Sequence, residues 1–267
     1  MSIQANYHTH TPRCMHAVGS EEEYIETAIR AGYDLLGFSD HGPWPFPEYV
    51  SHCRMTASQL PEYVDTIRRL QDRYADKIRL RLGLEIEYAP DYMDWLRDTK
   101  KEFGLDYLIF GNHFQHSEED NVYFGATGGA DEFALSYEEH AIKAMESGLY
   151  NCMAHPDLFL NSASGISPQA ERTLHNICKA AVKYDMPLEY NMLGEQRRLH
   201  PRPEFKEYLG YTLPQFWQIA AQYPVKAIIG CDAHEPEALD VMPRRREIRA
   251  MLEGMGITVL DTLPGVV

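Results

Sequence analysis

Apolar and polar residues alternate along the chain in two different rhythms. Short apolar runs predict buried strands, and stretches whose apolar residues recur every third or fourth position predict amphipathic helices. In the run at 78–87, Leu80, Leu82, Leu84 and Ile86 share one face, because successive strand side chains point in opposite directions. The predicted strands are about 3–8, 35–39, 78–87, 107–111, 150–154, 187–191 and 225–230.

Helix signals fall between these runs. Ser20 and Glu23 form a capping box ahead of a segment that ends at Gly32. Ser167 and Pro168 open another helix, with proline at its favoured first position. The predicted helices are 20–32, 60–74, 91–103, one capped by Ser136 and Glu139, 167–184, one from near Thr212, and 244–254; a long polar loop is expected after 191 and a short last strand at 257–260.

Regular alternation of strands and helices predicts an α/β fold with a parallel sheet, either doubly wound or closed into a barrel. The seven strand–helix units follow one another without a linker, a low-complexity segment or a shift in composition. We therefore expect a single domain over residues 1–267. The length suits an α/β barrel, which often runs to about this size as one domain.

Composition narrows the functional classes. The net charge of −15 argues against nucleic acid as the main partner, because binding a phosphate backbone requires a basic surface. The five cysteines are scattered and contain no Cys-x-x-Cys, which excludes a disulfide framework and a zinc ribbon. The sequence has neither a signal peptide nor an apolar run of membrane-spanning length, so we expect a cytoplasmic protein without membrane partners.

Two histidines at the end of the first predicted strand introduce the candidate chemistry. His8 and His10 are two positions apart, so their side chains project from the same face of a strand, as two ligands of one metal must. Histidines also occur often as solvated residues near a chain end. The interpretation therefore depends on partners elsewhere in the sequence.

Six of the seven predicted strands carry a metal-binding type of side chain at or just past their C-terminal end. Glu85 lies late in the third strand, on the face opposite its apolar stripe. In an open sheet such residues would lie along a line, whereas in a barrel they converge on one mouth, where barrel enzymes keep their active sites. The convergence favours a barrel. The residues are His8, His10, His41, Glu85, His113, His155, Asp232 and His234.

Six short motifs, in this order along nearly the whole chain, resemble those of the polymerase and histidinol phosphatase (PHP) domain family. Any one of them is weak, but the set is highly specific. They are Tyr7-His8-Thr9-His10, Ser39-Asp40-His41, Gly83-Leu84-Glu85, Gly111-Asn112-His113, Ala154-His155-Pro156-Asp157 and Gly230-Cys231-Asp232-Ala233-His234.

The resemblance implies a distorted seven-stranded TIM-like (β/α) barrel holding up to three divalent ions of zinc, iron or manganese. One ion is expected at His8, His10, Glu85 and Asp232, and a second shares Glu85. That second ion adds His113 and His155, and a third takes His16, His41 and His234. Many family members carry Asp where this chain has His16, and imidazole can also serve as a ligand. Asp40 is expected to orient a ligand rather than to bind metal.

Such a cluster suits hydrolysis of a phosphate monoester. Two cations lower the pKa of a bridging water and make hydroxide available for attack. The expected catalytic residues are Asp232, Glu85 and His234. Arg197 is the favoured phosphate contact, because Glu189-x-Asn191-x-x-Gly194-x-x-Arg197 resembles the histidinol-phosphatase branch. Other basic candidates are Arg13, Arg198 and Arg202.

The resemblance points to L-histidinol phosphate, a small phosphate monoester of histidine biosynthesis, as the substrate. Its amine and imidazole could meet carboxylates and aromatic rings of the mouth loops. Three alternatives stay open: a PHP phosphoesterase acting on nucleotides or another phosphate ester, an amidohydrolase, and a non-catalytic metal-binding protein. Candidates for the remote contacts are Glu118, Glu119, Asp120, Trp44, Phe46, Phe114, Tyr123, His116 and His200.

Overall fold

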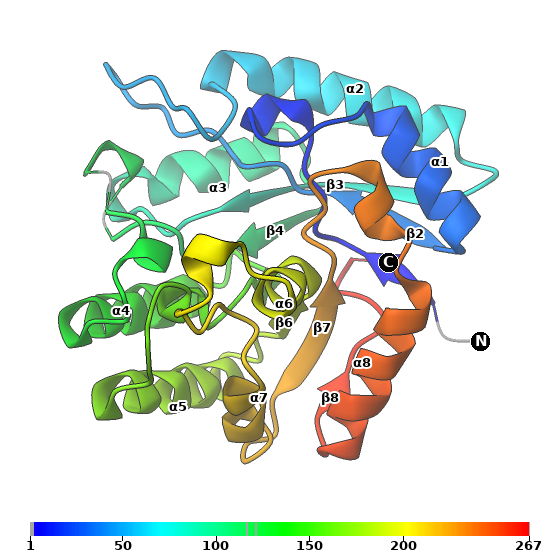
Figure 1. Cartoon of the computed structure of the whole chain (residues 1–267). Coiled ribbons are helices and arrows are strands. Elements are labelled where there is room, and N and C mark those ends of the chain that lie inside the picture. Colours follow the sequence, from blue (N-terminus) through cyan, green and yellow to red (C-terminus); the bar gives the residue numbers. More distant parts are fainter. Residues whose placement is uncertain (1–2, 116, 121, 267) are drawn as a thin grey trace.

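A parallel sheet curls through the centre of the molecule, and helices cover its outer face (Figure 1). The structure is a computed structural model that describes residues 3–115, 117–120 and 122–266. Its eight strands are hydrogen-bonded in chain order, and every pairing is parallel. They are β1 (Ala5–Asn6), β2 (Leu35–Phe38), β3 (Arg79–Ile86), β4 (Tyr107–Phe110), β5 (Cys152–Met153), β6 (Leu188–Asn191), β7 (Lys226–Gly230) and β8 (Thr258–Val259).

The two ends of the sheet approach each other beyond the strands. Thr9 and Ala233 form a parallel bridge between the chain after β1 and the chain after β7. His10 N donates to Ala233 O at 2.9 Å, and Ala233 N donates to His8 O at 3.2 Å. β8 pairs with the first residues of β7, so the predicted count of seven strands is not confirmed. The possible last strand expected at 257–260 is this eighth strand.

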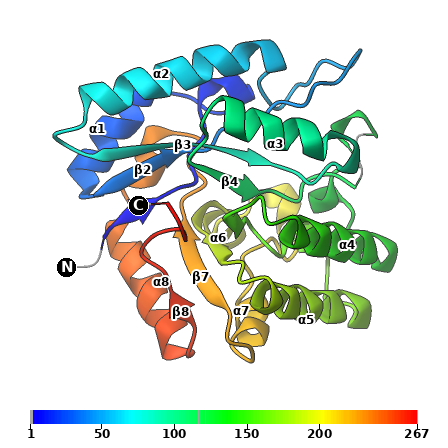
Figure 2. The same ribbon diagram turned by 180° about the vertical axis from the view of Figure 1, so that it is seen from behind.

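Most helices alternate with the strands and lie around the outside of the sheet, as the view from behind also shows (Figure 2). The Ser20 capping box is present at the first helix, and Gly32 ends it in a left-handed conformation. Ser167 accepts a hydrogen bond from Ala170 N and caps another, as its sequence predicts. The helices are α1 (Glu21–Ala31), α2 (Leu60–Arg73), α3 (Met93–Glu102), α4 (Asp131–Ser147), α5 (Pro168–Lys183), α6 (Met192–Leu199), α7 (Pro214–Ala220) and α8 (Met242–Gly254). No helix in the described part of the chain is long and apolar enough to cross a membrane.

Two helix predictions were wrong. The predicted cap at Ser136 lies inside α4, which begins five residues earlier at Asp131, where an acidic first turn complements the helix dipole. The expected polar loop after 191 instead begins with α6, because the Asn191 side chain accepts a hydrogen bond from Gly194 N and caps a helix. α6 follows β6 without a loop, and this brings Arg197 to the same end of the sheet as the ligand candidates.

The strands separate two apolar cores. Leu80, Leu82, Leu84 and Ile86 of β3 pack in the large core shared with the helices, as their spacing predicts. The alternate positions of the strands face the inside of the curled sheet. A smaller apolar core lies there. Its members are Ala5, Tyr7, Leu35, Tyr107, Ile109, Cys152, Ala154, Ile228, Leu263 and Val266.

Tyr107 sets the packing inside the sheet. Its ring lies against Gly83 of β3, where an added Cβ would come within 2.5–2.7 Å of three ring carbons. Its hydroxyl donates to Tyr7 O at 2.6 Å, so the ring also ties β4 to the chain after β1. The C-terminal segment closes the same core, since Tyr7 donates to Val266 O at 2.7 Å. The polar site therefore rests on a rigid apolar floor.

Gly83→Ala should destabilise the protein by about 1–3 kcal/mol, because the added methyl overpacks the core against Tyr107. Gly254→Ala is the matched control, since Gly254 lies in α8 with no atom within 4 Å of an added Cβ. That control should be neutral or stabilising by up to about 1 kcal/mol. Urea unfolding of the two variants measures the difference, and equal stabilities would contradict the packing argument.

Candidate metal centre

The residues predicted as ligands gather at the C-terminal ends of the strands. Glu85 lies in β3, and the others directly follow β1, β2, β4, β5 and β7, except His16 in the longer connection after β1. Most are buried, with exposed fractions between 0% and 8%, whereas His41 and His234 are partly exposed and His16 is exposed. The fold thus brings together side chains that are more than 200 residues apart in sequence.

The expected first set forms a compact group of four side chains. His8 Nε2 lies 3.4 Å from both Glu85 Oε2 and Asp232 Oδ1. His10 Nε2 lies 3.5 Å from Glu85 Oε2 and 3.1 Å from Asp232 Oδ1. Ligands about 2.0–2.1 Å from a tetrahedral ion are roughly 3.3–3.4 Å from one another. The observed spacing therefore fits one ion shared by all four.

The second set meets the other oxygen of the same carboxylate. Glu85 Oε1 lies 3.0 Å from His155 Nε2 and 3.3 Å from His113 Nε2, and these two nitrogens are 3.3 Å apart. Glu85 thus presents Oε2 to His8 and His10 and Oε1 to His113 and His155. This division is what a carboxylate bridging two ions requires.

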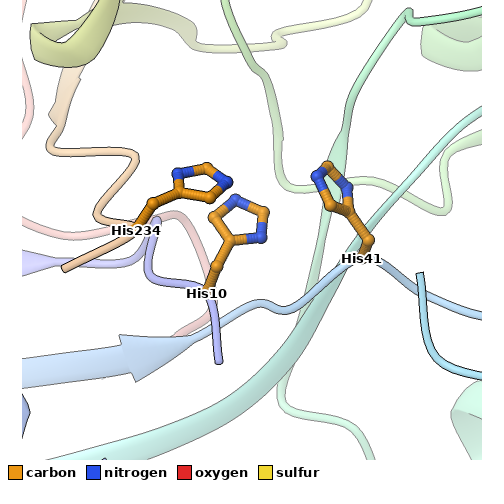
Figure 3. Close-up of side chains that lie close together, drawn as sticks. All are labelled: His10, His41 and His234. Carbon is orange, nitrogen blue, oxygen red and sulfur yellow. The ribbon is translucent and has the colours of Figure 1, made fainter. Parts of the chain in front are cut away.

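The third set has His10 as a close neighbour in addition to the expected His16, His41 and His234. The rings of His10, His41 and His234 come together, and their ligand atoms lie within 4.8 Å of one another (Figure 3). His16 stacks on His234 with ring centroids 4.8 Å apart, and its centroid is 5.3 Å from that of His41. Cys14, which the sequence did not single out as a ligand, forms a similar group with His16 and His234.

Buried ring nitrogens test whether these residues suit a metal. A buried nitrogen without a partner costs free energy, and a cation supplies the missing interaction for a lone pair. All but one of the buried side-chain nitrogen and oxygen atoms without a hydrogen-bond partner, among the described residues, belong to the predicted ligand histidines. These nitrogens are His8 Nε2, His10 Nδ1 and Nε2, His41 Nδ1, His155 Nδ1 and His234 Nε2.

The electrostatics of the cluster favour bound positive charge. Burial raises the pKa of Glu85, but His113, His8 and His41 outweigh burial and hold it well below its usual range. Burial lowers the pKa of His113, yet Glu85 and Glu87 raise it to about 10. The cluster therefore keeps carboxylates ionised and attracts cations, either protons or metal ions.

The electrostatic environment differs among the rings. The pKa of His10 rises to about 9, because Asp232, Asp40 and Glu85 together outweigh its burial. The pKa of His234 falls to about 3, because burial and the neighbouring His10 outweigh Asp232. Neutral imidazole is the form that binds metal, so His234 is ready to bind without losing a proton.

Two residues of the cluster have strained backbones. His155 and Asp232 adopt positive φ angles of 30° and 52°. Non-glycine residues in such conformations persist only where the surrounding structure holds them, and they concentrate at functional sites. Aspartate and asparagine tolerate this region better than most residues.

A cavity of about 270 Å³ opens over the cluster. Arg197 from α6 lines it together with Phe114 and Tyr123, so these three sequence candidates are brought to the site. Tyr211 and Leu158 also line it and were missed. The sequence around Tyr211 gave no signal of a site, because its neighbours in the cavity are distant in the chain. Its ring centroid lies 6.1 Å from that of His155, which is more than 50 residues away in sequence.

Other substrate-contact candidates lie elsewhere. Arg13 pairs with Glu21 and Glu62 on the surface, and Arg198 donates to Thr212 O at 3.2 Å. Arg202, His200 and Glu119 are exposed and do not line the cavity, and His116 is outside the described residues. Trp44 and Phe46 line a separate hollow. The sequence suggested Glu118 as a contact for the substrate amine. The structure shows instead that Glu118 is 5% exposed and accepts a hydrogen bond from Arg54, so it is not available for an amine.

Comparison with known proteins agrees with the geometry. The sequence model of the PHP domain matches residues 6–193, most of the chain. The chain belongs to the PHP domain family. This is the family that its six motifs predicted.

Two relatives align with most of this PHP chain. A Deinococcus radiodurans protein named "Probable histidinol-phosphatase" is 31% identical over 242 residues, which are 86% of this chain and 85% of the relative. The histidinol-phosphatase of Bacillus subtilis is 29% identical over 85% of this chain and 92% of its own length.

A solved structure shares the fold. Histidinol phosphate phosphatase from Lactococcus lactis, complexed with zinc, L-histidinol and phosphate, superposes with a TM-score of 0.71. The match covers 98% of this chain and 97% of the other at 18% identity, which establishes a common architecture.

Protein purified without chelator should carry about two to three equivalents of zinc, iron or manganese, since the cluster offers paired carboxylates and unpartnered imidazoles. Chelation should lower the melting temperature and re-addition of metal should restore it, because metal binds the folded state. Elemental analysis and thermal unfolding measure both effects. His155→Asn should lose about one equivalent, whereas exposed His200→Asn should lose none. Less than one equivalent in the wild type would exclude the cluster.

Proposed function

We propose that this PHP protein is a metal-dependent phosphomonoesterase that hydrolyses L-histidinol phosphate to L-histidinol and phosphate. The observation that carries the proposal is the division of Glu85 between two groups of buried imidazoles, directly beneath a cavity lined by Arg197. The names of relatives that align over most of their length support the substrate.

The proposed ligands are nine residues in up to three sites. His8, His10, Glu85 and Asp232 would hold one divalent ion, and Glu85 with His113 and His155 a second. His16, His41 and His234 would hold a third, with Cys14 close enough to contribute. When bound, these ions would supply a water of lowered pKa and positive charge for the oxygens of the phosphate. Zinc, iron and manganese are all compatible with imidazole and carboxylate ligands.

The protein groups around the reacting phosphate have distinct proposed roles. Arg197 would bind a phosphate oxygen through its guanidinium and orient the ester. Asp232 lies 6% exposed at the floor of the cavity and would accept a proton from the attacking water. Its pKa is held well below the usual range, because His8, His10 and His234 outweigh burial, so the carboxylate is ionised.

The remote end of the substrate would meet the aromatic wall of the cavity. Phe114, Tyr123 and Tyr211 line it beside Arg197. An aromatic ring can stack on an imidazole or accept a cation on its face. The cavity volume of about 270 Å³ suits a small ester.

We further propose that residues 1–267 form one domain of this type. One apolar core extends from Tyr24 to Val259 and supports the proposal. All five cysteines of the described chain are free thiols, in keeping with the reducing cytoplasm expected from the sequence, and that location stays a prediction.

Asp232→Asn should lower turnover by at least ~10²-fold, because the neutral amide cannot accept the proton. Asparagine tolerates the positive φ of this position, so the fold should be retained. Asp185→Asn is the matched control, since exposed Asp185 also has a positive φ, of 54°, but lies outside the site. Steady-state kinetics at saturating metal make the comparison. Near-normal turnover in Asp232→Asn would remove this residue from the mechanism.

Catalytic efficiency on L-histidinol phosphate should exceed that on simple alkyl phosphates by about 10²-fold or more, on the order of 3 kcal/mol. The reason is that contacts to the remote imidazole and amine are used in the transition state and not only in binding. Values of kcat/KM on a panel of esters, including nucleotides, test the assignment. Equal efficiency on all monoesters would leave a general phosphatase, and a preference for nucleotides would favour the alternative PHP activity.

A further inference from the structure

A buried ion network lies beside the metal centre and has no role in the mechanism above. Arg54 is 1% exposed and donates hydrogen bonds to both oxygens of Glu87, with Nη1–Oε2 at 2.9 Å and Nη2–Oε1 at 2.7 Å. Arg54 Nε donates to Glu118 Oε2 at 2.6 Å, and Nη1 also donates to Gly42 O at 2.9 Å. The guanidinium is therefore engaged on three sides.

Glu87 in turn holds a proposed metal ligand. Its Oε1 lies 2.8 Å from His113 Nδ1, and because an ionised carboxylate only accepts, Nδ1 carries the proton. This leaves His113 Nε2 facing Glu85 Oε1 and His155 Nε2, both at 3.3 Å. The second oxygen of Glu87 accepts from Trp44 Nε1 at 3.0 Å, so the carboxylate cannot rotate freely.

We propose that Glu87 and Arg54 act together as a positioning pair, in which Arg54 fixes the carboxylate of Glu87 and Glu87 orients His113 toward the metal. The inference rests on the proposed metal centre. A carboxylate that accepts the outer N–H of a ligating histidine fixes its tautomer and ring orientation and raises its basicity. The bidentate arginine adds geometric control, because its planar fork sets the plane of the carboxylate.

Arg54 lines the cavity, so a direct role in binding phosphate must be weighed against this positioning role. Its Nε, Nη1 and Nη2 atoms all donate to Glu87, Glu118 or Gly42. Moving toward a substrate would leave two buried carboxylates without their cation, which costs several kcal/mol. Arg197 contacts Tyr211 and forms no salt bridge with a carboxylate of the described residues, so it is the better phosphate contact.

The network also fixes Arg54 independently of any metal. Glu118 lies in the segment after β4 and accepts from Ser51 Oγ at 2.7 Å and from Tyr49 Oη at 3.1 Å, both in the segment after β2. Arg54 thus joins two segments at the mouth of the sheet. His113 is held by a scaffold whose contacts are all between protein groups, which is what a preorganised ligand needs.

The same hydrogen bond recurs at a second proposed ligand. Glu189 Oε1 lies 2.7 Å from His8 Nδ1, and Glu189 is 2% exposed. Its other donors are the neutral amide of Asn191 at 2.8 Å and His155 N at 3.2 Å. Two ligand histidines from different strands are thus held by carboxylates that the sequence motifs did not assign as ligands.

The test measures metal affinity by chelator competition on Glu87→Gln and Arg54→Lys. Glu87→Gln should weaken one of the bound equivalents by about 10–100-fold and leave the others in place. Arg54→Lys should weaken the same equivalent by less, because it keeps the charge but loses the fork. Glu195→Gln is the matched control, since Glu195 is a buried glutamate held by Arg244 at 2.6 and 3.0 Å and touches no ligand histidine.

Melting temperatures of the metal-free variants separate positioning from a purely structural role. The inference holds if Glu87→Gln loses affinity at one site while the metal-free protein keeps its stability relative to Glu195→Gln. It is overturned if affinity is unchanged, or if Glu195→Gln weakens metal equally. If Glu87→Gln does not fold, unchanged metal affinity in Arg54→Lys overturns it. Wild-type protein that binds no metal would instead refute the proposed function itself.

Discussion

The buried carboxylate of Glu85 is the constraint on which the site depends. At 1% exposure it cannot be solvated, so its charge must be balanced by groups that the fold delivers from several strands. Oε2 faces His8, His10 and His41, and Oε1 faces His113 and His155. The converging ends of the parallel strands bring these rings to one carboxylate. The contacts that balance the charge of Glu85 therefore depend on the curl of the sheet.

The surrounding backbone is shaped to make room for this arrangement. An added Cβ at Gly111 would lie 2.5 Å from His113 Cε1 and 2.6 Å from Glu85 Oε1, so only glycine allows the approach. His155 and Asp232 hold strained backbone conformations, which direct both side chains into the cluster. Beneath the cluster, Tyr107 of the smaller apolar core packs against Gly83. The ligand cluster and this core therefore share the inward face of the sheet.

Much of the fold, and the gathering of the candidate ligands at the strand ends, could be predicted because strand and helix patterns are local and parallel strands end on the same side of the sheet. The alternation in β3 placed Leu80 and Glu85 on opposite faces, and the spacing of His8 and His10 placed both on one. α6 was missed because its cap, Asn191, ends a strand and gives no separate signal. Arg54 was not predicted either, since its role depends on Glu87 and Glu118, which are 33 and 64 residues away. Such contacts arise from tertiary packing, which local patterns do not encode.

Charge balance explains why the network and the metal centre belong together. Six buried carboxylates surround the centre, and Arg54 balances only two of them, Glu87 and Glu118. Asp40, Glu85, Glu189 and Asp232 rely instead on histidines, and the pKa values of His8 and His10 are raised accordingly, although burial opposes this. Where no metal is bound, these raised pKa values favour the protonated rings, whose charge compensates the carboxylates. Metal ions would replace these protons, so binding and proton release are linked. Arg54 balances the charge of Glu87, so this carboxylate does not require a metal ion as its counter-charge. It can instead accept the hydrogen bond that orients His113.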